Sequence, residues 1–91
     1  MELSQRVRAI VSFVEAADAG SFAAAARSQG ISPAAVSKNI AGLEQALGVR
    51  LMNRTTRTLS LTEEGRVFLQ QARIAIGALD TAMDAVVARK M

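Results

Sequence analysis

The sequence predicts a mainly α-helical domain that carries one short two-stranded hairpin and ends in a long helix. Apolar residues recur at helical spacing over most of the chain, whereas alternation at period two is confined to residues 50–61. Hydrophobic residues make up 51% of the sequence but aromatic residues only 3%, because many apolar positions are alanine. Small side chains suit closely packed helices better than a sandwich of strands. At 91 residues, the chain is expected to form one domain.

The composition also argues against several classes of site. The sequence has no cysteine and no histidine, so it lacks disulfides, ordinary zinc sites and histidine-based acid–base catalysis. We therefore expect no enzymatic activity, no metal and no cofactor. No apolar run approaches the roughly 18 residues of a membrane-spanning helix, and the lack of cysteine fits a cytoplasmic protein. The net charge of +3 hints at a polyanionic partner.

Two helices are predicted in the first third of the chain. Residues 4–17 form an amphipathic pattern, with apolar side chains at Val7, Ile10, Val11, Val14 and Ala17. Gly20 can end this helix, because glycine adopts the left-handed conformation without a Cβ penalty. Ser21 then caps a short second helix that ends at Gly30. The inner face of this second helix is expected to hold Phe22, Ala25 and Ala26.

A third helix is predicted over about residues 32–47. Ser32 supplies the N-cap, and Pro33 suits the first helical position. The buried stripe is expected at Val36, Ile40, Leu43 and Leu47. The opposite face then carries small or polar residues, namely Ala34, Lys38, Ala41 and Gln45, with Ser37 on one flank. Together with the second helix and the tight glycine-containing turn, this segment forms a helix-turn-helix.

A basic hairpin is predicted directly behind the third helix, at about residues 50–61. Leu59 and Leu61 alternate with polar residues at period two, as in a half-buried strand. Three arginines and no acid lie between Arg50 and Arg57. The hairpin would act as a wing. The predicted fold class is therefore a winged helix-turn-helix over residues 1–62, with three helices and a two-stranded wing.

The small-residue face of the third helix and the basic wing together point to double-stranded DNA. The second helix of such a pair enters the major groove, where small side chains let the backbone approach the bases. We expect DNA contacts from Ser32, Pro33, Ala34, Ser37 and Lys38 on the helix, and from Arg54, Thr56 and Arg57 on the wing. The wing would lie on the phosphate backbone or in the minor groove. Ser21 and Arg27 are weaker candidates for backbone contacts.

Other interpretations of these segments stay open at this point. Alanine makes good helix surface in any protein, so the third helix alone does not decide the partner. The arginine-rich hairpin could be a solvated turn. A winged helix can also serve for protein–protein contact, although its exposed helix face would then normally be larger and more apolar.

A long fourth helix is predicted over residues 63–91. Thr62 caps it, and Glu63 and Glu64 lie favourably at its positive end. Apolar residues form a stripe along this helix. Its first part, at Phe68 and Leu69, can pack on the first helix, but so small a domain cannot cover the rest of this apolar stripe. We therefore expect a homodimer through this helix, with contacts at Ala72, Ala75, Leu79, Ala82, Met83 and Val86. Asp80 and Asp84 lie one turn apart without further ligands and are interpreted as solvated surface.

A specific spacing of small, polar and leucine positions runs along nearly the whole chain. It comprises Gly20-Ser21-Phe22, Ala25-Ala26, Ser32, Val36-Ser37-Lys38, Ile40, Leu43-Glu44, Leu47-Gly48, Leu51, Arg54 and Leu61-Thr62-Glu63-Glu64-Gly65. This pattern resembles the N-terminal domain of LysR-type transcriptional regulators. The resemblance implies a winged helix-turn-helix, a linker helix that pairs antiparallel with a partner's, and control of bacterial promoters. It also implies DNA contacts at Ser37, Lys38, Arg54 and Arg57.

The sequence departs from the family pattern at a few positions. Gln29 stands at a usual leucine, and Met52 stands where phenylalanine is usual. Pro33 and Ala34 fall where glutamine and serine are common, so base reading there would rest on apolar contact. Family members also carry an effector-binding domain, and a small-molecule effector would act only through that domain, which is absent here. We expect a DNA-binding part of a longer regulator, with a naturally short protein as the alternative.

Overall fold

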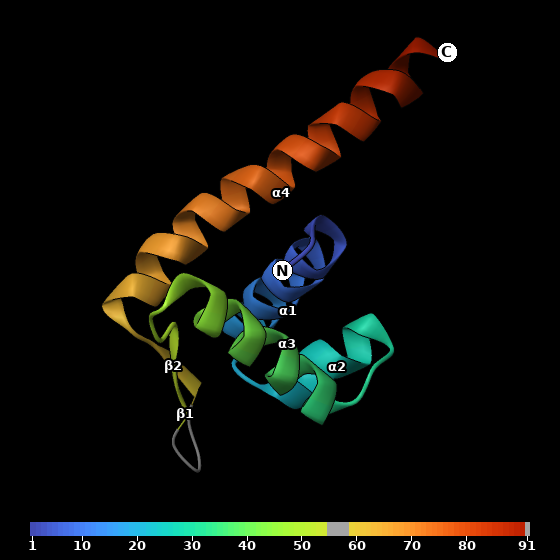
Figure 1. Ribbon diagram of the computed structural model, residues 1–91. Helices are drawn as coiled ribbons and strands as arrows, with labels where there is room; N and C mark the ends of the chain where they lie inside the picture. Colours follow the sequence, from blue (N-terminus) through green and yellow to red (C-terminus); the bar gives the residue numbers. More distant parts are fainter. Residues whose placement is uncertain (55–58, 91) are drawn as a thin grey trace.

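The computed structural model describes residues 1–54 and 59–90 and has the expected fold class (Figure 1). In chain order, the elements are α1 (Leu3–Ala19), α2 (Phe22–Gln29), α3 (Pro33–Leu47), β1 (Met52–Arg54), β2 (Leu59–Leu61) and α4 (Glu63–Arg89). The first three helices form a compact body, with the hairpin at one side and α4 leaving as a long rod. The molecule is accordingly elongated, at 49 × 25 × 22 Å.

The helices begin at the capping residues that the sequence carries. The hydroxyl oxygens of Ser21 and Ser32 accept the backbone N–H groups of Ala24 and Ala35, each at 3.1 Å. These bonds satisfy amides that have no partner inside the helix. Between α2 and α3 the chain reverses at Gly30, whose φ of 69° lies in the left-handed region that favours glycine. The tight turn of the helix-turn-helix follows from these residues.

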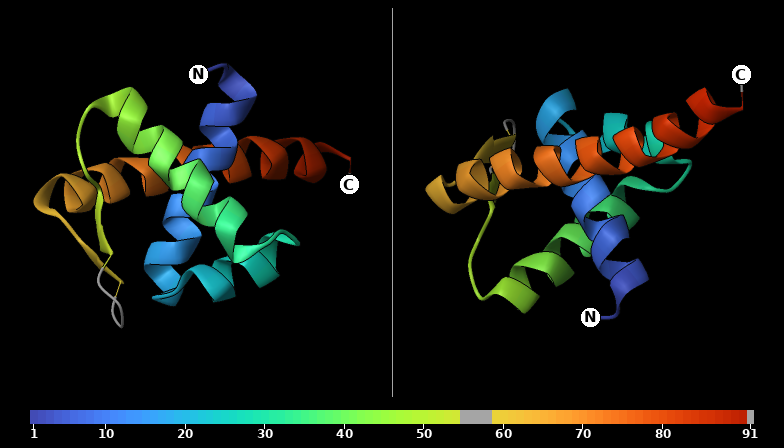
Figure 2. Two further views of the ribbon diagram at one scale, coloured as in Figure 1. Left: turned by 60° about the horizontal axis from the view of Figure 1, so that its bottom comes forward. Right: turned by 90° about the horizontal axis from the view of Figure 1, so that it is seen from above.

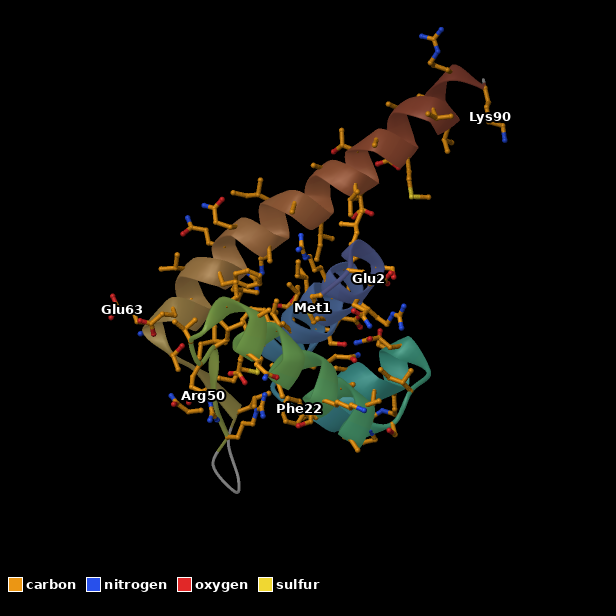
Figure 3. All side chains as sticks on the ribbon, in the orientation of Figure 1. Met1, Glu2, Phe22, Arg50, Glu63 and Lys90 are labelled. Atoms are coloured by element: carbon orange, nitrogen blue, oxygen red, sulfur yellow. The ribbon has the colours of Figure 1, made fainter. Side chains whose placement is uncertain are left out.

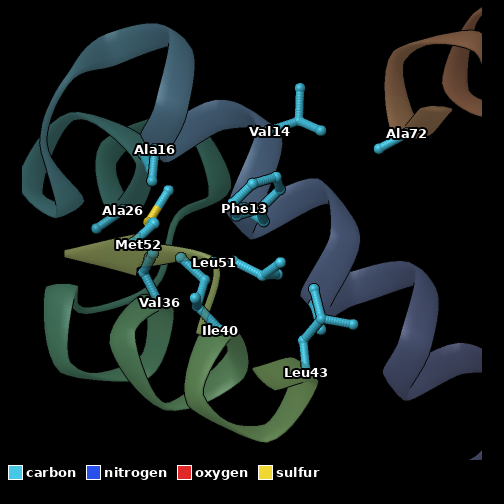
Figure 4. Packing of buried hydrophobic residues seen from close by; sticks show 12 residues of the cluster. Phe13, Val14, Ala16, Ala26, Val36, Ile40, Leu43, Leu51, Met52 and Ala72 are labelled. Carbon is cyan, nitrogen blue, oxygen red and sulfur yellow. The ribbon is translucent and has the colours of Figure 1, made fainter. Parts of the chain in front are cut away.

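The core lies between the three N-terminal helices and is closed by β1 and α4. Figure 4 shows Phe13, Ile40 and Leu51 pointing toward one another, and all three are fully buried. Phe13 also meets Phe68 of α4 edge to face, with ring centroids 5.6 Å apart. These large apolar groups come from α1, α3, α4 and the segment just before β1, so the core holds the whole body together.

Two of the predicted buried stripes are partly wrong. In α1, Val7 is exposed, and the buried face instead runs through Ala9, Phe13 and Ala16. In α3, Leu47 is exposed, and Glu44 takes the inward position near the end of the helix. The spacing of apolar residues predicts that a helix has an apolar face. Which residues of that face are buried depends on where the neighbouring helices pack against it. Alanine lets a neighbouring helix come close, and the last turn of α3 lies beyond the core.

The first half of α4 belongs to the domain body. Figure 2 shows α4 crossing α1 on the side opposite to α3. Ala72 is buried in the core, and Leu69 and Ile76 pack against it, so the contact is longer than predicted from Phe68 and Leu69 alone. An ion pair between Arg73 and Asp18 of α1 reinforces the contact at the surface. The first half of α4, as far as Ile76, therefore packs together with the three N-terminal helices.

The root of the hairpin is tied to the start of α4. The Thr62 hydroxyl donates to the Arg50 carbonyl oxygen at 2.7 Å, and the Thr62 N–H donates to the Leu51 carbonyl oxygen at 3.0 Å. The same hydroxyl oxygen accepts the Gly65 N–H as the helix cap. Over residues 1–54 and 59–90, no helix is long and apolar enough to cross a membrane.

Candidate nucleic-acid interface

The outer face of α3 is small and without exposed acid. Ala34, Lys38 and Ala41 are exposed, whereas Ser37 is half-buried at the edge of the face. Ser32 and Pro33 are exposed at the start of the helix, where free backbone amides and the helix dipole favour an anion. The single acid of α3, Glu44, is buried. The face can thus approach a polyanion without repulsion from its own helix.

The two other candidate residues of the helix pair lie on α2. Ser21 is half-buried, and its oxygen is already engaged by the Ala24 N–H. Its hydroxyl hydrogen can still donate outward. Arg27 is exposed in the last turn of α2.

The hairpin lies beside the C-terminal half of α3 (Figure 1). Its strands pair antiparallel, with Met52 opposite Leu61, Asn53 opposite Ser60 and Arg54 opposite Leu59. Met52 is buried, which fixes one face of the hairpin to the body. Thr56 and Arg57, which we predicted to contact DNA, lie outside the described residues. Among the described wing cations, Arg50 is the exposed one, and its side chain is 66% exposed at the hairpin root (Figure 3).

Arg54, which we predicted to contact DNA, has its charge engaged by another residue of the domain. Its Nη2 donates to Glu44 Oε1 at 2.8 Å, and its side chain is only 26% exposed. The guanidinium carbon also lies 5.7 Å from the centre of the Phe22 ring, within the range of a cation–π contact. The Arg54 charge is therefore engaged inside the domain, between α3 and the first residue of α2. The direct DNA contact predicted for Arg54 stays a prediction, for a side chain that already has partners within the domain.

Sequence reasoning missed the role of Glu44. Its Oε2 accepts the backbone N–H groups of Leu51 and Met52, at 2.7 and 3.2 Å. Arg50 Nε lies 3.7 Å from the same oxygen. A signal was present, because Glu44 follows Ile40 at a spacing of four and thus continues the buried stripe. An acid on an inward position, followed by a basic segment, indicates an internal ion pair.

A second polar group that sequence reasoning missed links the first three helices. Asn39 Nδ2 donates to the Ser12 hydroxyl oxygen at 3.2 Å, and the Ser12 hydroxyl donates to Gln29 Oε1 at 3.0 Å. Ser12 is fully buried on α1. Gln29 Nε2 is also buried and has no hydrogen-bond partner within the described part of the chain. The departure noted at Gln29 thus places an amide inside the helix-turn-helix.

The distal half of α4 leaves a row of apolar side chains exposed. It comprises Leu79, Met83, Val86 and Val87. Ala75 and Ala82 are exposed beside this row, as predicted for an interface. Ala72 is not, because it is only 4% exposed and packs into the core of its own chain. The predicted dimer contact at Ala72 stays a prediction, for a side chain that the single chain already covers.

An apolar cleft lies at the opposite end of α4. Its walls come from the segment after α3 and from the first turns of α4, and they include Val49, Leu51, Val67, Phe68 and Gln71. Glu63 and Glu64 lie at the rim of this cleft. The two ends of α4 therefore carry complementary features, since Arg89 and Lys90 stand at its C-terminus.

A helix-turn-helix with a paired hairpin behind its second helix defines the winged helix-turn-helix class of DNA-binding domains. Within that class, the chain belongs to the LysR family, because residues 7–66 match the bacterial regulatory helix-turn-helix proteins of that family.

Relatives and solved structures agree with this assignment. An HTH-type transcriptional repressor of Pseudomonas aeruginosa (strain UCBPP-PA14) is 43% identical over 75 residues, which cover 82% of this chain and 24% of that protein. The crystal structure of the CbnR DNA-binding domain with DNA superposes with a TM-score of 0.82 at 32% identity, over 100% of both chains. The crystal structure of the BenM DNA-binding domain with catB site 1 DNA superposes with a TM-score of 0.83 at 31% identity, over 98% of this chain and 93% of that one. The chain spans about a quarter of the length of its curated relatives.

Proposed function

We propose that this chain is the sequence-specific DNA-binding domain of a dimeric bacterial transcription regulator. The observation that carries the proposal is the outer face of α3, which is small, exposed and free of acid, and which lies beside a basic hairpin. A helix with such a face fits the major groove of B-DNA, which is about 12 Å wide. The solved DNA complexes of the CbnR and BenM domains support the same mode of binding.

In this proposal, the N-terminal half of α3 reads the bases. Ala34 and Pro33 bring apolar surface to the groove, where they can meet thymine methyl groups. Ser37 and Lys38 supply the polar contacts to bases or phosphates, and the amides near Ser32 hold a phosphate. Because Ser37 is half-buried, its hydroxyl has a restricted position, which suits discrimination between bases.

Backbone contacts come from the flanks of the helix pair. On one side, the wing contributes Thr56 and Arg57 to phosphates or to the minor groove. On the other side, Ser21 and Arg27 of α2 lie at the start and end of a helix that would cross the backbone. The exposed Arg50 at the hairpin root adds a further cation near α3.

The distal half of α4 is proposed as the dimer interface, with contacts at Ala75, Leu79, Ala82, Met83 and Val86. An antiparallel arrangement lets the apolar stripe of each α4 cover that of its partner. It also brings the acidic first turn of one helix, at Glu63 and Glu64, toward the basic C-terminal end of the other, at Arg89. These opposite charges favour antiparallel over parallel pairing. Two domains held this way can read two half-sites.

The remaining features of the whole protein are also proposals. Residues 1–62 carry the DNA contacts, and residues 63–91 link and dimerise. The curated relatives are about four times as long as this chain, which supports a regulator with a further domain outside it. A small-molecule effector would bind that domain. Such a protein would act in the bacterial cytoplasm, and we propose no catalytic role for the domain.

Salt-dependent DNA binding tests the proposal. Affinity for duplex DNA should fall steeply with salt, because each neutralised phosphate releases counterions. Lys38→Ala should flatten the log–log slope by about one unit. Arg73→Ala removes the same charge on α4, where Arg73 pairs with Asp18, and should leave the slope unchanged. Binding that is insensitive to salt, or equal slopes in wild type and Lys38→Ala, would contradict the placement of α3 on DNA.

A further inference from the structure

We propose that Glu44 and Arg54 form a clasp that holds the wing in position against α3, and that Arg54 acts on DNA binding through this clasp. The Glu44 clasp consists of the Glu44 carboxylate, the Leu51 and Met52 amides, and the Arg54 guanidinium. The inference rests on the proposed DNA-binding function. It assigns Glu44 and Arg54 as positioning residues instead of DNA contacts.

The geometry of the carboxylate is the first step. Glu44 is 7% exposed, so its charge has little water and depends on protein donors. Oε2 receives two backbone amides and Oε1 receives the Arg54 guanidinium, all within hydrogen-bond distance. Hydrogen bonds to an ionised acceptor are the strong class. Both amides belong to the entry of β1, so the wing cannot shift without uncovering a buried charge.

The surroundings of Arg54 are the second step. Its guanidinium lies against the Phe22 ring on one side and bonds to Glu44 on another. Arg54 Nε is buried and has no hydrogen-bond partner within residues 1–54 and 59–90. To reach a DNA phosphate, this side chain would have to abandon Glu44, whose remaining cation is Arg50, with its Nε 3.7 Å from Oε2. The clasp therefore joins α2, α3 and β1, which are the elements that must meet DNA together.

Arg50 provides the contrast within the same segment. Its side chain is mostly exposed, and its Nε lies 3.7 Å from Glu44, beyond hydrogen-bond distance. Arg50 can turn toward a phosphate at little cost, whereas Arg54 cannot. Two arginines four residues apart thus serve different purposes, which their spacing in the sequence does not reveal.

The two possible roles of Arg54 give opposite signs for one substitution. If Arg54 gripped phosphate, Glu44→Gln would remove a negative charge beside the DNA and free the guanidinium, so binding would tighten. If the clasp holds the wing, Glu44→Gln loses the charge that organises it, so binding weakens. A change that affected stability alone would leave the affinity of the folded protein unaltered.

The experiment compares Glu44→Gln, Arg54→Ala and Arg54→Lys with wild type, and uses Arg73→Ala as the control for charge. Without DNA, amide hydrogen exchange at Leu51 and Met52 should accelerate in Glu44→Gln and Arg54→Ala but not in the control. With DNA, both variants should bind about tenfold more weakly, at an unchanged salt slope. The double variant should bind no more weakly than either single one. Arg54→Lys should restore binding only in part, because lysine lacks the planar fork.

Three results would overturn the clasp. They are tighter binding by Glu44→Gln, a salt slope flattened by about one unit in Arg54→Ala, and full rescue by Arg54→Lys. If Glu44→Gln fails to fold, the two Arg54 variants decide through the salt slope and the rescue. Loss of salt-dependent binding by wild type would overturn the proposed function alone, because exchange at the two amides still tests the clasp.

Discussion

Gly65 lies so close to Leu51 that a Cβ atom added to Gly65 would be 2.0 Å from the Leu51 carbonyl oxygen. That carbonyl accepts the Thr62 N–H and therefore cannot simply turn away. At Gly65 and Leu51, the start of α4 and the root of the wing thus meet backbone to backbone. Only glycine permits this approach, because any other residue places a carbon where the carbonyl stands.

We expect Gly65→Ala to lower the free energy of unfolding by about 1–3 kcal/mol, as overpacking of a tight site does. Urea unfolding followed by circular dichroism measures the change. Gly77→Ala in the same helix is the matched control, because no described atom lies within 4 Å of its added Cβ. Gly77→Ala should instead stabilise the helix by up to about 1 kcal/mol. Equal effects at both positions would mean that the close approach to Leu51 does not exist in solution.

The polar group at Ser12 gives a second stability prediction. Ser12→Ala should cost about 1–3 kcal/mol, because it leaves the buried amides of Gln29 and Asn39 without their partner. Adding Gln29→Leu should recover much of the loss, since the buried Gln29 amide is then removed as well. A double-mutant cycle by urea unfolding measures the coupling. Simple additivity of the two substitutions would show that the hydrogen bond contributes nothing.

Recognition of the bases by α3 can be separated from binding to the phosphate backbone. Ser37→Ala should weaken binding to the selected site by about 1–3 kcal/mol and leave binding to random duplex DNA nearly unchanged, because base edges carry the sequence information. The measurement is a competition between a site selected from random DNA and an unrelated duplex. Ser28→Ala is the matched control, since Ser28 is exposed on α2 beside Glu15 and Asp18. Equal losses on both DNAs would show that Ser37 does not read bases.

Local signals in the sequence predicted the elements of this fold well. Ser21, Ser32 and Thr62 cap the helices as expected, because a cap depends on residues a few positions away. The wing was predicted from the alternation of apolar and polar residues. The long fourth helix was predicted from apolar residues at helical spacing.

Predictions of which way a side chain points were less successful. Arg50 and Arg54 look alike in sequence, yet Arg54 turns inward toward Glu44 and Phe22, whereas Arg50 stays mostly exposed. Ala72 fits the dimer stripe by spacing, but α1 covers it first. In both cases, the burial of the side chain depends on an element distant in sequence that packs against it. A pattern along one helix does not contain that information.

Assembly through α4 gives the last prediction. Leu79 is exposed in the single chain and lies beyond the last contact of α4 with the core. At a two-fold interface, Leu79→Arg would bury an unpaired cation near its symmetry mate, which costs several kcal/mol. The variant should therefore be monomeric while its helix content stays that of wild type.

Sedimentation at micromolar concentration measures the state of each protein. Asp84→Arg is the matched control, because it places arginine on the polar side of the same helix and should remain dimeric. The Leu79→Arg monomer should still bind a single half-site, since α3 lies on the opposite side of α1 from α4. Its affinity for a paired site should drop toward that for one half-site, because linkage of two domains raises affinity without new contacts. A dimeric Leu79→Arg protein, or a monomeric wild type, would contradict this role of α4.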